Sequence, residues 1–224
     1  MKKGFYLLSV FFLFFFLSGN AMASIVTITA TGTTDTISQT PALNDLLNKE
    51  LTITAVFNTN ATDTNPSLNT GSYVDSLISF SAALDGQPIS GGNWDAGALS
   101  VSNDSGSPFY DSFDLSTYYE TITPVSFSGL GPYSTSNIVI VLRDSGSTAF
   151  NSTVIPESYD LADFDISFLS VIFQPSTNGI NTRVDAAITS LNVTVDPVPI
   201  PGAVWLVGSG LIGFAGIRKK IYKI

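Results

Sequence analysis

Oxygen-bearing side chains are the residues of this sequence whose spacing could support chemistry. The segment 58–72 offers Asn58, Asn60, Asp63 and Asn65 at spacings of two or three residues. Calcium favours hard oxygen donors of this kind, so Asp63 and Asn65 are candidate calcium ligands, and calcium is the one cofactor that the sequence suggests. The segment lacks the Asp-x-Asp-x-Asp-Gly pattern. An ordinary hairpin loop, built on turns that Asn, Asp and Thr favour, is therefore the alternative.

A second acidic set comprises Asp160, Asp163 and Asp165. If this segment is a strand, Asp163 and Asp165 share one face, and Asp160 would have to fold back to join them. The alternative is that all these carboxylates occupy exposed positions at the entrance of a strand.

Paired carboxylates could also hydrolyse a glycosidic bond, because that chemistry needs only two acids at a fixed separation. The sequence does not place any two acids opposite each other, but four are candidates: Asp111, Asp114, Glu120 and Glu157. Aromatic side chains suited to stacking on sugar rings are also present, although aromatic residues on strands commonly belong to the core: Trp94, Tyr110, Tyr118 and Tyr119. Carbohydrate binding is therefore an alternative function, and hydrolysis a further one.

Composition excludes several other kinds of site. The chain has neither cysteine nor histidine, which excludes disulfides, thiolate or imidazole metal sites and His-dependent nucleophilic catalysis within it. All 18 acidic residues lie between positions 35 and 196, where the only basic residues are Lys49, Arg143 and Arg183. An acidic body of this kind argues against nucleic-acid binding, which depends on basic patches, and favours solubility at a cell surface. We expect no enzymatic activity.

Short runs with period-2 alternation, separated by Gly, Asn, Asp and Pro, predict antiparallel strands through residues 24–196. The run 51–57 places its apolar residues on one face, and 137–142 is apolar on both faces, as in a central strand. In the run 163–173 we expect Phe164, Ile166 and Phe168 to point inward, with Val171 and Phe173 as further inward candidates. These features predict a single all-β ectodomain, a β-sandwich or jelly-roll-like fold of two antiparallel sheets. Helix is expected only as short turns at 41–47 and 156–162.

The first 23 residues have the organisation of a secretory signal peptide. Lys2 and Lys3 precede an apolar run at 5–17, and the small residues Ala21 and Ala23 stand where signal peptidase requires them. We expect cleavage after Ala23. The alternative, an uncleaved anchor, is disfavoured because the apolar run is shorter than the roughly 20 residues that span a membrane.

The segment 197–224 combines three elements in order. A proline-rich neck occupies 197–201, an uncharged run occupies 202–217, and a basic tail at 218–224 includes Arg218, Lys219 and Lys220. Proline removes backbone donors and fixes φ, so the neck is expected to be extended. The uncharged run predicts a short transmembrane helix. The basic tail serves as the stop-transfer signal and keeps the body outside the cytoplasm.

This segment resembles the PEP-CTERM family of C-terminal sorting signals, in a Val-Pro-Leu-Pro-Ala-like variant. The resemblance lies in Val198, Pro199, Ile200 and Pro201, in the Trp-Leu and Ser-Gly-Leu sequences that follow, and in the basic tail. Ile200 stands where the family's namesake motif has Glu. The resemblance implies that an exosortase, a membrane enzyme of Gram-negative bacteria that make exopolysaccharide, cuts the chain near this motif.

These features together predict an exported cell-surface or biofilm-matrix protein. The chain would be held in the inner membrane as a single-pass intermediate and then transferred to the surface or matrix. Its expected partners are the sorting enzyme, the inner membrane as a temporary tether and, if the alternative function holds, exopolysaccharide.

Overall fold

The computed structural model of this chain describes residues 24–38, 41–65, 67–89, 94–106, 109–119, 124–126, 132–175 and 181–197. Within these ranges it gives the backbone alone for residues 41–42, 94–96, 118–119, 124–126, 132–134, 175 and 197. The regular elements are strands and two 3-10 helices: β1 (Ser24–Ser38), η1 (Pro41–Leu46), β2 (Glu50–Asn58), β3 (Thr70–Tyr73), β4 (Leu77–Leu84), β5 (Gln87–Pro88), β6 (Trp94–Gly106), β7 (Phe109–Tyr119), β8 (Pro124–Ser126), β9 (Pro132–Asp144), η2 (Leu161–Asp163), β10 (Ile166–Pro175) and β11 (Thr182–Pro197).

The strands form one continuous sheet in the order β3-β6-β7-β9-β10-β11-β1-β2-β4-β5, with β8 paired to β9 off this path. The prediction of an all-β antiparallel fold is therefore confirmed. The expected division into two separate sheets is not confirmed, because hydrogen bonding continues from one half of the sheet to the other. Residues Ser24–Asp196 make up the compact unit that this sheet builds.

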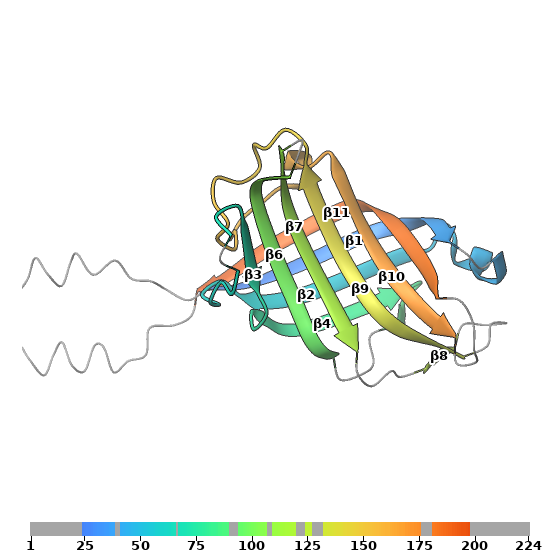
Figure 1. Ribbon diagram of the computed structural model, residues 1–224. Coiled ribbons are helices and arrows are strands. Elements are labelled where there is room, and N and C mark those ends of the chain that lie inside the picture. Colours follow the sequence, from blue (N-terminus) through green and yellow to red (C-terminus); the bar gives the residue numbers. More distant parts are fainter. Residues whose placement is uncertain are drawn as a thin grey trace, which may run out of the picture. The chain divides into compact units, whose positions relative to one another are not determined.

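The sheet folds over on itself. β3 ends at Tyr73 and β4 begins at Leu77, yet these strands lie towards opposite ends of the hydrogen-bonded order. A connection this short requires the two ends of the sheet to approach each other. Figure 1 shows the result: β3, β6, β7, β9 and β10 cross in front of β11, β1, β2 and β4. We call these groups the front layer and the back layer.

The core lies between the two layers. In β2 the alternating residues Leu51, Ile53, Ala55 and Phe57 are all fully buried, as their period-2 spacing predicts. The Phe57 ring lies 6.0 Å from the ring of Phe113 on β7, so the two layers meet through their aromatic side chains. β9 is an interior strand of the sheet, because β7 and β10 pair with its two edges.

The predicted burial along 163–173 is right for Phe164, Val171 and Phe173 and wrong for Ile166 and Phe168. Leu169, Val171 and Phe173 are fully buried, whereas Ile166 is 42% exposed and Phe168 belongs to the opposite face. Because side chains alternate strictly along a strand, an error of one position moves the whole set to the other face. The error arises at Phe164, which is buried but precedes the first strand residue, Ile166.

The short helical turn expected at 41–47 appears as η1, whereas η2 overlaps the range expected at 156–162 only at Leu161 and Ala162. The predicted signal helix and transmembrane helix lie outside the described residues. Among the described ranges, no helix is long and apolar enough to cross a membrane.

Candidate functional site

The connection between β9 and β10, residues 145–165, is far longer than the usual loop of about 4–6 residues. We call it the β9–β10 loop. Loops held on a rigid scaffold are the usual place for binding residues. The contacts that hold this loop therefore decide what kind of site it could form.

Asp144, the last residue of β9, fixes the beginning of the loop. Its Oδ2 accepts hydrogen bonds from the backbone N–H groups of Thr148 (2.7 Å) and Ala149 (3.0 Å) and from the Thr148 hydroxyl (2.9 Å). Its Oδ1 accepts the Gly146 N–H at 2.7 Å. The hydrogen bond from the Thr148 backbone, aided by the other donors, lowers the pKa of the Asp144 carboxyl. The loop thus begins around a carboxylate held in its charged form.

Asp111 on β7 lies opposite Asp144 in the antiparallel register and is fully buried. Its Oδ2 accepts the Phe150 N–H from the β9–β10 loop at 2.8 Å. Its Oδ1 accepts the Asp104 N–H from the end of β6 at 2.9 Å. One buried carboxylate therefore joins two separate segments to the edge of the core.

Tyr73 on β3 holds the middle of the loop. Its hydroxyl donates a hydrogen bond of 2.7 Å to the Thr153 carbonyl oxygen. A Cβ atom at Gly71 would lie only 2.8 Å from the same oxygen. The close approach of the loop to β3 therefore requires glycine at position 71.

Apolar side chains pack the loop onto the core. Ile155 is 2% exposed. The Tyr159 ring lies 5.2 Å from Phe113 and 6.3 Å from Phe164, and the Phe150 ring lies 5.8 Å from Phe164. Burial raises the pKa of the Tyr159 hydroxyl well above its ordinary value, and this hydroxyl has no hydrogen-bond partner. The second half of the loop is therefore fixed mainly by packing.

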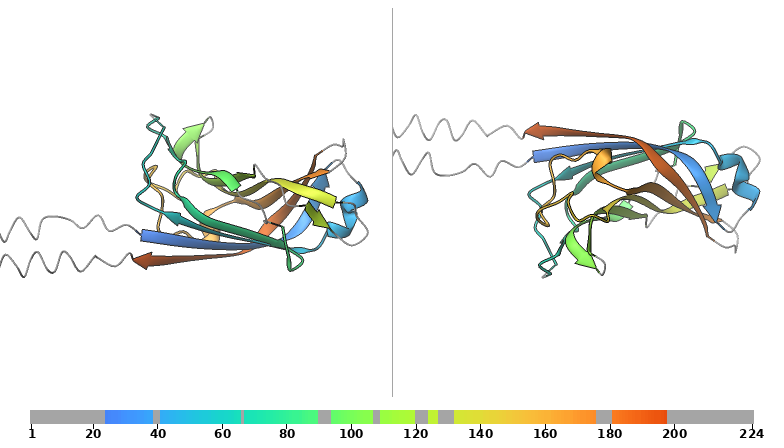
Figure 2. Two further views of the ribbon diagram at one scale, coloured as in Figure 1. Left: turned by 90° about the horizontal axis from the view of Figure 1, so that it is seen from below. Right: turned by 90° about the horizontal axis from the view of Figure 1, so that it is seen from above.

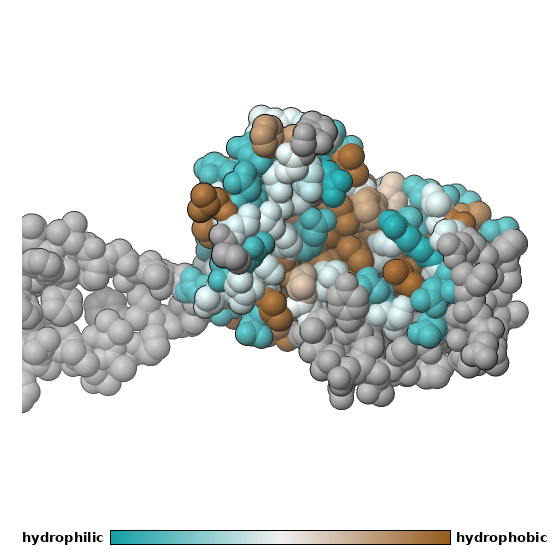
Figure 3. Space-filling view, in the orientation of Figure 1, coloured by the Kyte–Doolittle hydropathy of each residue, from teal (hydrophilic) through white to brown (hydrophobic). Residues whose placement is uncertain are grey.

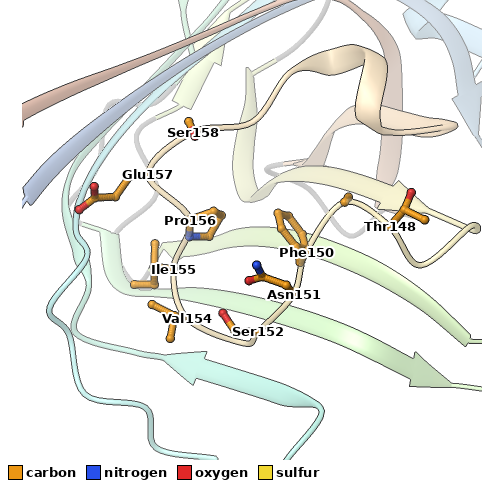
Figure 4. A pocket seen from close by; sticks show the side chains of 10 residues that line it. Thr148, Phe150, Asn151, Ser152, Val154, Ile155, Pro156, Glu157 and Ser158 are labelled. Carbon is orange, nitrogen blue, oxygen red and sulfur yellow. The ribbon is translucent and has the colours of Figure 1, made fainter.

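The loop borders an open hollow of about 370 Å³ lined by residues 148–152 and 154–158 (Figure 4). Phe150 and Asn151 extend from one arm of the loop towards Pro156 on the other arm, whereas Glu157 extends away from it. The lining therefore offers an amide, an aromatic ring and hydroxyl groups, without a carboxylate pair. Such a lining suits a neutral polar ligand held by hydrogen bonds.

The predicted calcium ligands lie in a different loop, between β2 and β3. Asp63 Oδ1 accepts the N–H groups of Asn65 and Ser72, both at 2.8 Å. Asn65 Oδ1 accepts the Ser67 N–H at 3.0 Å, and Asn58 makes a turn of the same kind. These contacts agree with the hairpin-turn alternative. Among the described residues, no group of three or more acidic side chains is placed to hold a metal ion.

The second acidic set does not lie on one strand face. Asp160 and Asp163 cap η2 reciprocally, and the Asp160 N–H donates to Asp163 Oδ2 at 3.0 Å. Asp165 Oδ1 accepts the Ser145 N–H at 2.9 Å and so closes the base of the β9–β10 loop. The strand begins only at Ile166, so the condition for Asp163 and Asp165 to share a strand face is not met. All three carboxylates are exposed just before the strand, as the alternative predicts.

The candidate hydrolytic acids are separated. Asp111 points into the core side of β7 and Asp114, three positions further, faces the other side. Glu157 is exposed on the loop, and Glu120 lies outside the described residues. The carboxylate that does approach Asp111 is Asp144, which sequence reasoning missed. An Asp that ends an apolar strand and precedes Ser-Gly was the available signal for a turn at this position.

The aromatic candidates gather at one end of a strand pair. Trp94 lies opposite Tyr119, and Tyr118 lies opposite Ala96, in the register of β6 and β7. Their side chains are not described. Tyr110 lies at the other end of β7.

The residues of the predicted targeting signals lie outside the described ranges: Ala21, Ala23, Val198, Pro199, Ile200, Pro201, Arg218, Lys219 and Lys220. No protein-family model matches the chain, and comparison with curated proteins and solved structures gave no match.

Proposed function

We propose that this chain is an exported surface or matrix protein of a Gram-negative bacterium, without catalytic activity of its own. The observation that carries the proposal is the extent of the compact unit, Ser24–Asp196. Its first residue follows the expected signal-peptidase site, and its last residue precedes the proline neck. In fold class, we propose that the folded-over sheet serves as a sandwich-like ectodomain.

The arrangement of the first and last strands supports the same proposal. β1 and β11 are neighbours in the sheet and run in opposite directions, so Ser24 and Asp196 lie at the same end of the body (Figure 2). Removal of the segments before Ser24 and after Asp196 would leave every strand pair of the body in place. A body of this design can be released from a membrane intermediate without refolding.

Fractionation and mass spectrometry of the mature protein test this proposal. We expect the body in the surface or medium fraction, with Ser24 as its first residue and without Trp205. A double variant, Pro199→Ala with Pro201→Ala, is expected to keep the C-terminal segment and remain in the membrane fraction. Pro88→Ala, at an exposed position of β5, is the matched control and should be processed normally. A cytoplasmic body that keeps Met1 contradicts export. A mature protein that retains Trp205 contradicts sorting by cleavage.

A second candidate function, carbohydrate binding, is favoured by the register that brings Trp94 opposite Tyr119, with Tyr118 the preceding residue of β7. Aromatic residues gathered at one end of a strand pair would allow sugar rings to stack. We expect the exported protein to be retained on the exopolysaccharide of its own cells, and Trp94→Ala or Tyr118→Ala to weaken retention. Absence of retention by the unaltered protein would remove this candidate and leave the export proposal intact.

A further inference from the structure

The outer face of the sheet carries both arginines of the acidic body, Arg143 on β9 in the front layer and Arg183 on β11 in the back layer. β9 alternates along its length: Ile138, Ile140 and Leu142 belong to the core cluster, whereas Arg143 belongs to the other face. On β11, Val184 points inward and Arg183 outward in the same way. Arg143 lies opposite Ile166 and Arg183 opposite Ile172, six positions apart along β10, so each arginine has its own surroundings.

Small side chains surround this region. The register places Ser102 opposite Ser112 and Ser112 opposite Arg143, and in the next row Ser100 opposite Asp114 and Asp114 opposite Val141. Val141 is only 8% exposed although it is not part of the core cluster. Figure 3, which views this face, shows hydrophobic residues over its middle with more polar residues on either side. The face thus combines apolar area with closely spaced hydroxyl and charged groups.

Arg143 is oriented by stacking on Tyr110. Its guanidinium carbon lies 4.5 Å from the centre of the Tyr110 ring, an arrangement that fixes the plane of the charged group. Its Nε is buried without a hydrogen-bond partner. Asp114 is diagonally adjacent across the strand pair, yet no carboxylate of the described residues comes within the 4.0 Å of an ion pair with Arg143. A buried donor without a protein partner needs an acceptor from solvent or from a ligand.

Arg183 on the same face is different. Its Nε donates to Asp185 at 2.7 Å, while its guanidinium lies 5.4 Å from the centre of the Phe168 ring. Its charge is therefore already compensated within the protein. This contrast indicates that Arg143, and not Arg183, is available for a ligand.

Asp114 supplies an acceptor beside Arg143. Its Oδ2 accepts the Ser112 hydroxyl at 2.7 Å. Burial raises the pKa of the Asp114 carboxyl, against the opposing effects of Ser112 and Arg143. An unpaired guanidinium and a half-buried carboxylate with free acceptor capacity therefore lie next to each other.

We propose that Arg143, Tyr110 and Asp114, with the neighbouring serines, bind a carboxylate-bearing sugar of the uronic-acid class within a polysaccharide. This inference rests on the second candidate function, carbohydrate binding, and names its ligand class. The guanidinium fork of Arg143 pairs with the sugar carboxylate, Asp114 accepts a sugar hydroxyl, and the serine hydroxyls complete the polar contacts.

The surrounding charges select a carboxylate over a phosphate. A phosphate monoester carries close to two negative charges at neutral pH, and it would lie beside Asp114 in a body dominated by acidic residues. A carboxylate brings a single charge, so it meets less repulsion from Asp114 than a phosphate does. A sugar also brings hydroxyl donors for Asp114, which a simple anion lacks.

Titration calorimetry of the exported protein with oligogalacturonate tests the proposal, with the carboxyl-reduced neutral oligomer of equal length as the paired probe. We expect the acidic oligomer to bind more tightly. Arg143→Gln is expected to lose affinity by about tenfold or more, the usual cost of a hydrogen bond to a charged group. Arg143→Lys, which keeps the charge without the planar fork, is expected to fall between the two.

Arg183→Gln is the matched control, since it removes the same side chain from the same face. Its affinity should stay within about twofold of the unaltered protein, because an exposed ion pair contributes little. Circular dichroism and thermal unfolding of each variant confirm that it folds. Equal affinity for the acidic and neutral oligomers, or equal losses in the two glutamine variants, overturns the uronate site while carbohydrate binding stands. An exported protein that binds neither oligomer overturns the site and carbohydrate binding, but not export.

Discussion

The two long loops of this molecule are fixed in different ways. The β2–β3 loop, residues 59–69, is held largely by its own side chains, because Asp63, Asn65 and Ser67 each accept a backbone N–H two positions ahead. The β9–β10 loop is held mainly by two buried carboxylates that lie outside it, at Asp111 and Asp144. The conformation of the β2–β3 loop therefore depends mainly on hydrogen bonds between neighbouring residues, whereas that of the β9–β10 loop depends on the sheet.

The difference determines how each loop responds to change. A loop built from local turns keeps its shape even if its connection to the sheet is loosened, and its polar side chains are exposed to water. A loop held by buried carboxylates loses its backbone partners when the anchor is removed, because those N–H groups are then left unsatisfied. The sheet therefore determines the conformation of the β9–β10 loop and of the hollow that the loop lines.

Removal of the buried anchor should give the largest effect. Asp111→Ala leaves the Phe150 and Asp104 N–H groups without their acceptor at a fully buried position. We expect a loss of about 3 kcal/mol in the free energy of unfolding, measured by urea denaturation. Asp63→Ala, the equivalent change in the local loop, should cost no more than about 0.5 kcal/mol. Similar losses in the two variants would mean that the loops are held in the same way.

A side chain added where β3 closely approaches the β9–β10 loop should give the next largest loss of stability. Gly71→Ala places a Cβ atom 2.8 Å from the Thr153 oxygen, which is backbone and cannot move without the loop. We expect a loss of about 2 kcal/mol, as in overpacked sites. Gly86→Ala is the contrasting change: the site is open, and only its positive φ of 74° opposes a side chain. It should cost about 1 kcal/mol, and a greater loss there than at Gly71 would contradict the close approach.

Removing the hydroxyl group from each of two tyrosines should change the stability of the protein in opposite directions. Tyr73→Phe removes the hydrogen bond to the Thr153 oxygen and should destabilise the protein by about 1 kcal/mol. Tyr159→Phe removes a buried hydroxyl that has no partner, so it should leave stability unchanged or raise it by about 1 kcal/mol. Thermal unfolding of both variants measures the difference. A larger loss in Tyr159→Phe than in Tyr73→Phe would contradict the described packing of the loop.

The local alternation of apolar and polar residues was sufficient to predict much of the fold. The alternation in 51–57 predicted which residues of β2 are buried, because burial on one face requires period 2. The doubly apolar run 137–142 predicted a central strand, and β9 has a strand on each side. In β10 the same reasoning failed, since both faces carry large apolar residues and Phe164 is buried without being part of the strand.

The sites depended on pairings that the sequence does not show. Asp111 and Asp144 meet because β7 and β9 are neighbours, which the register of distant segments decides. Arg143 and Tyr110 meet for the same reason, whereas Asp63 and Asn65 could be interpreted as a turn from their own spacing. Contacts within about five residues could therefore be predicted, while contacts across strands could not.

Acidification should give the smallest effect, but one that is specific to the β9–β10 loop and does not extend to the β2–β3 loop. The pKa of Asp144 is lowered by the Thr148 N–H and its neighbours, and the pKa of Asp165 is lowered by the Ser145 N–H. A folded-state pKa below the unfolded value means that the stabilisation is present above the unfolded value of about 4 and is lost as pH falls through the folded value. The beginning of the β9–β10 loop should therefore loosen below about pH 4 while the strands remain paired.

Amide hydrogen exchange between pH 3 and pH 6, corrected for intrinsic rates, measures this loosening. We expect the protection of the Gly146, Thr148 and Ala149 amides to fall in acid, and the protection of strand amides at Ile140 and Leu142 to persist. Asp144→Asn, which cannot become charged, should show weak loop protection at every pH. Protection that falls equally in β9 and in the loop would indicate global unfolding and contradict a local carboxylate anchor. Protection that stays constant in the unaltered protein would show that the charge on Asp144 does not hold the loop.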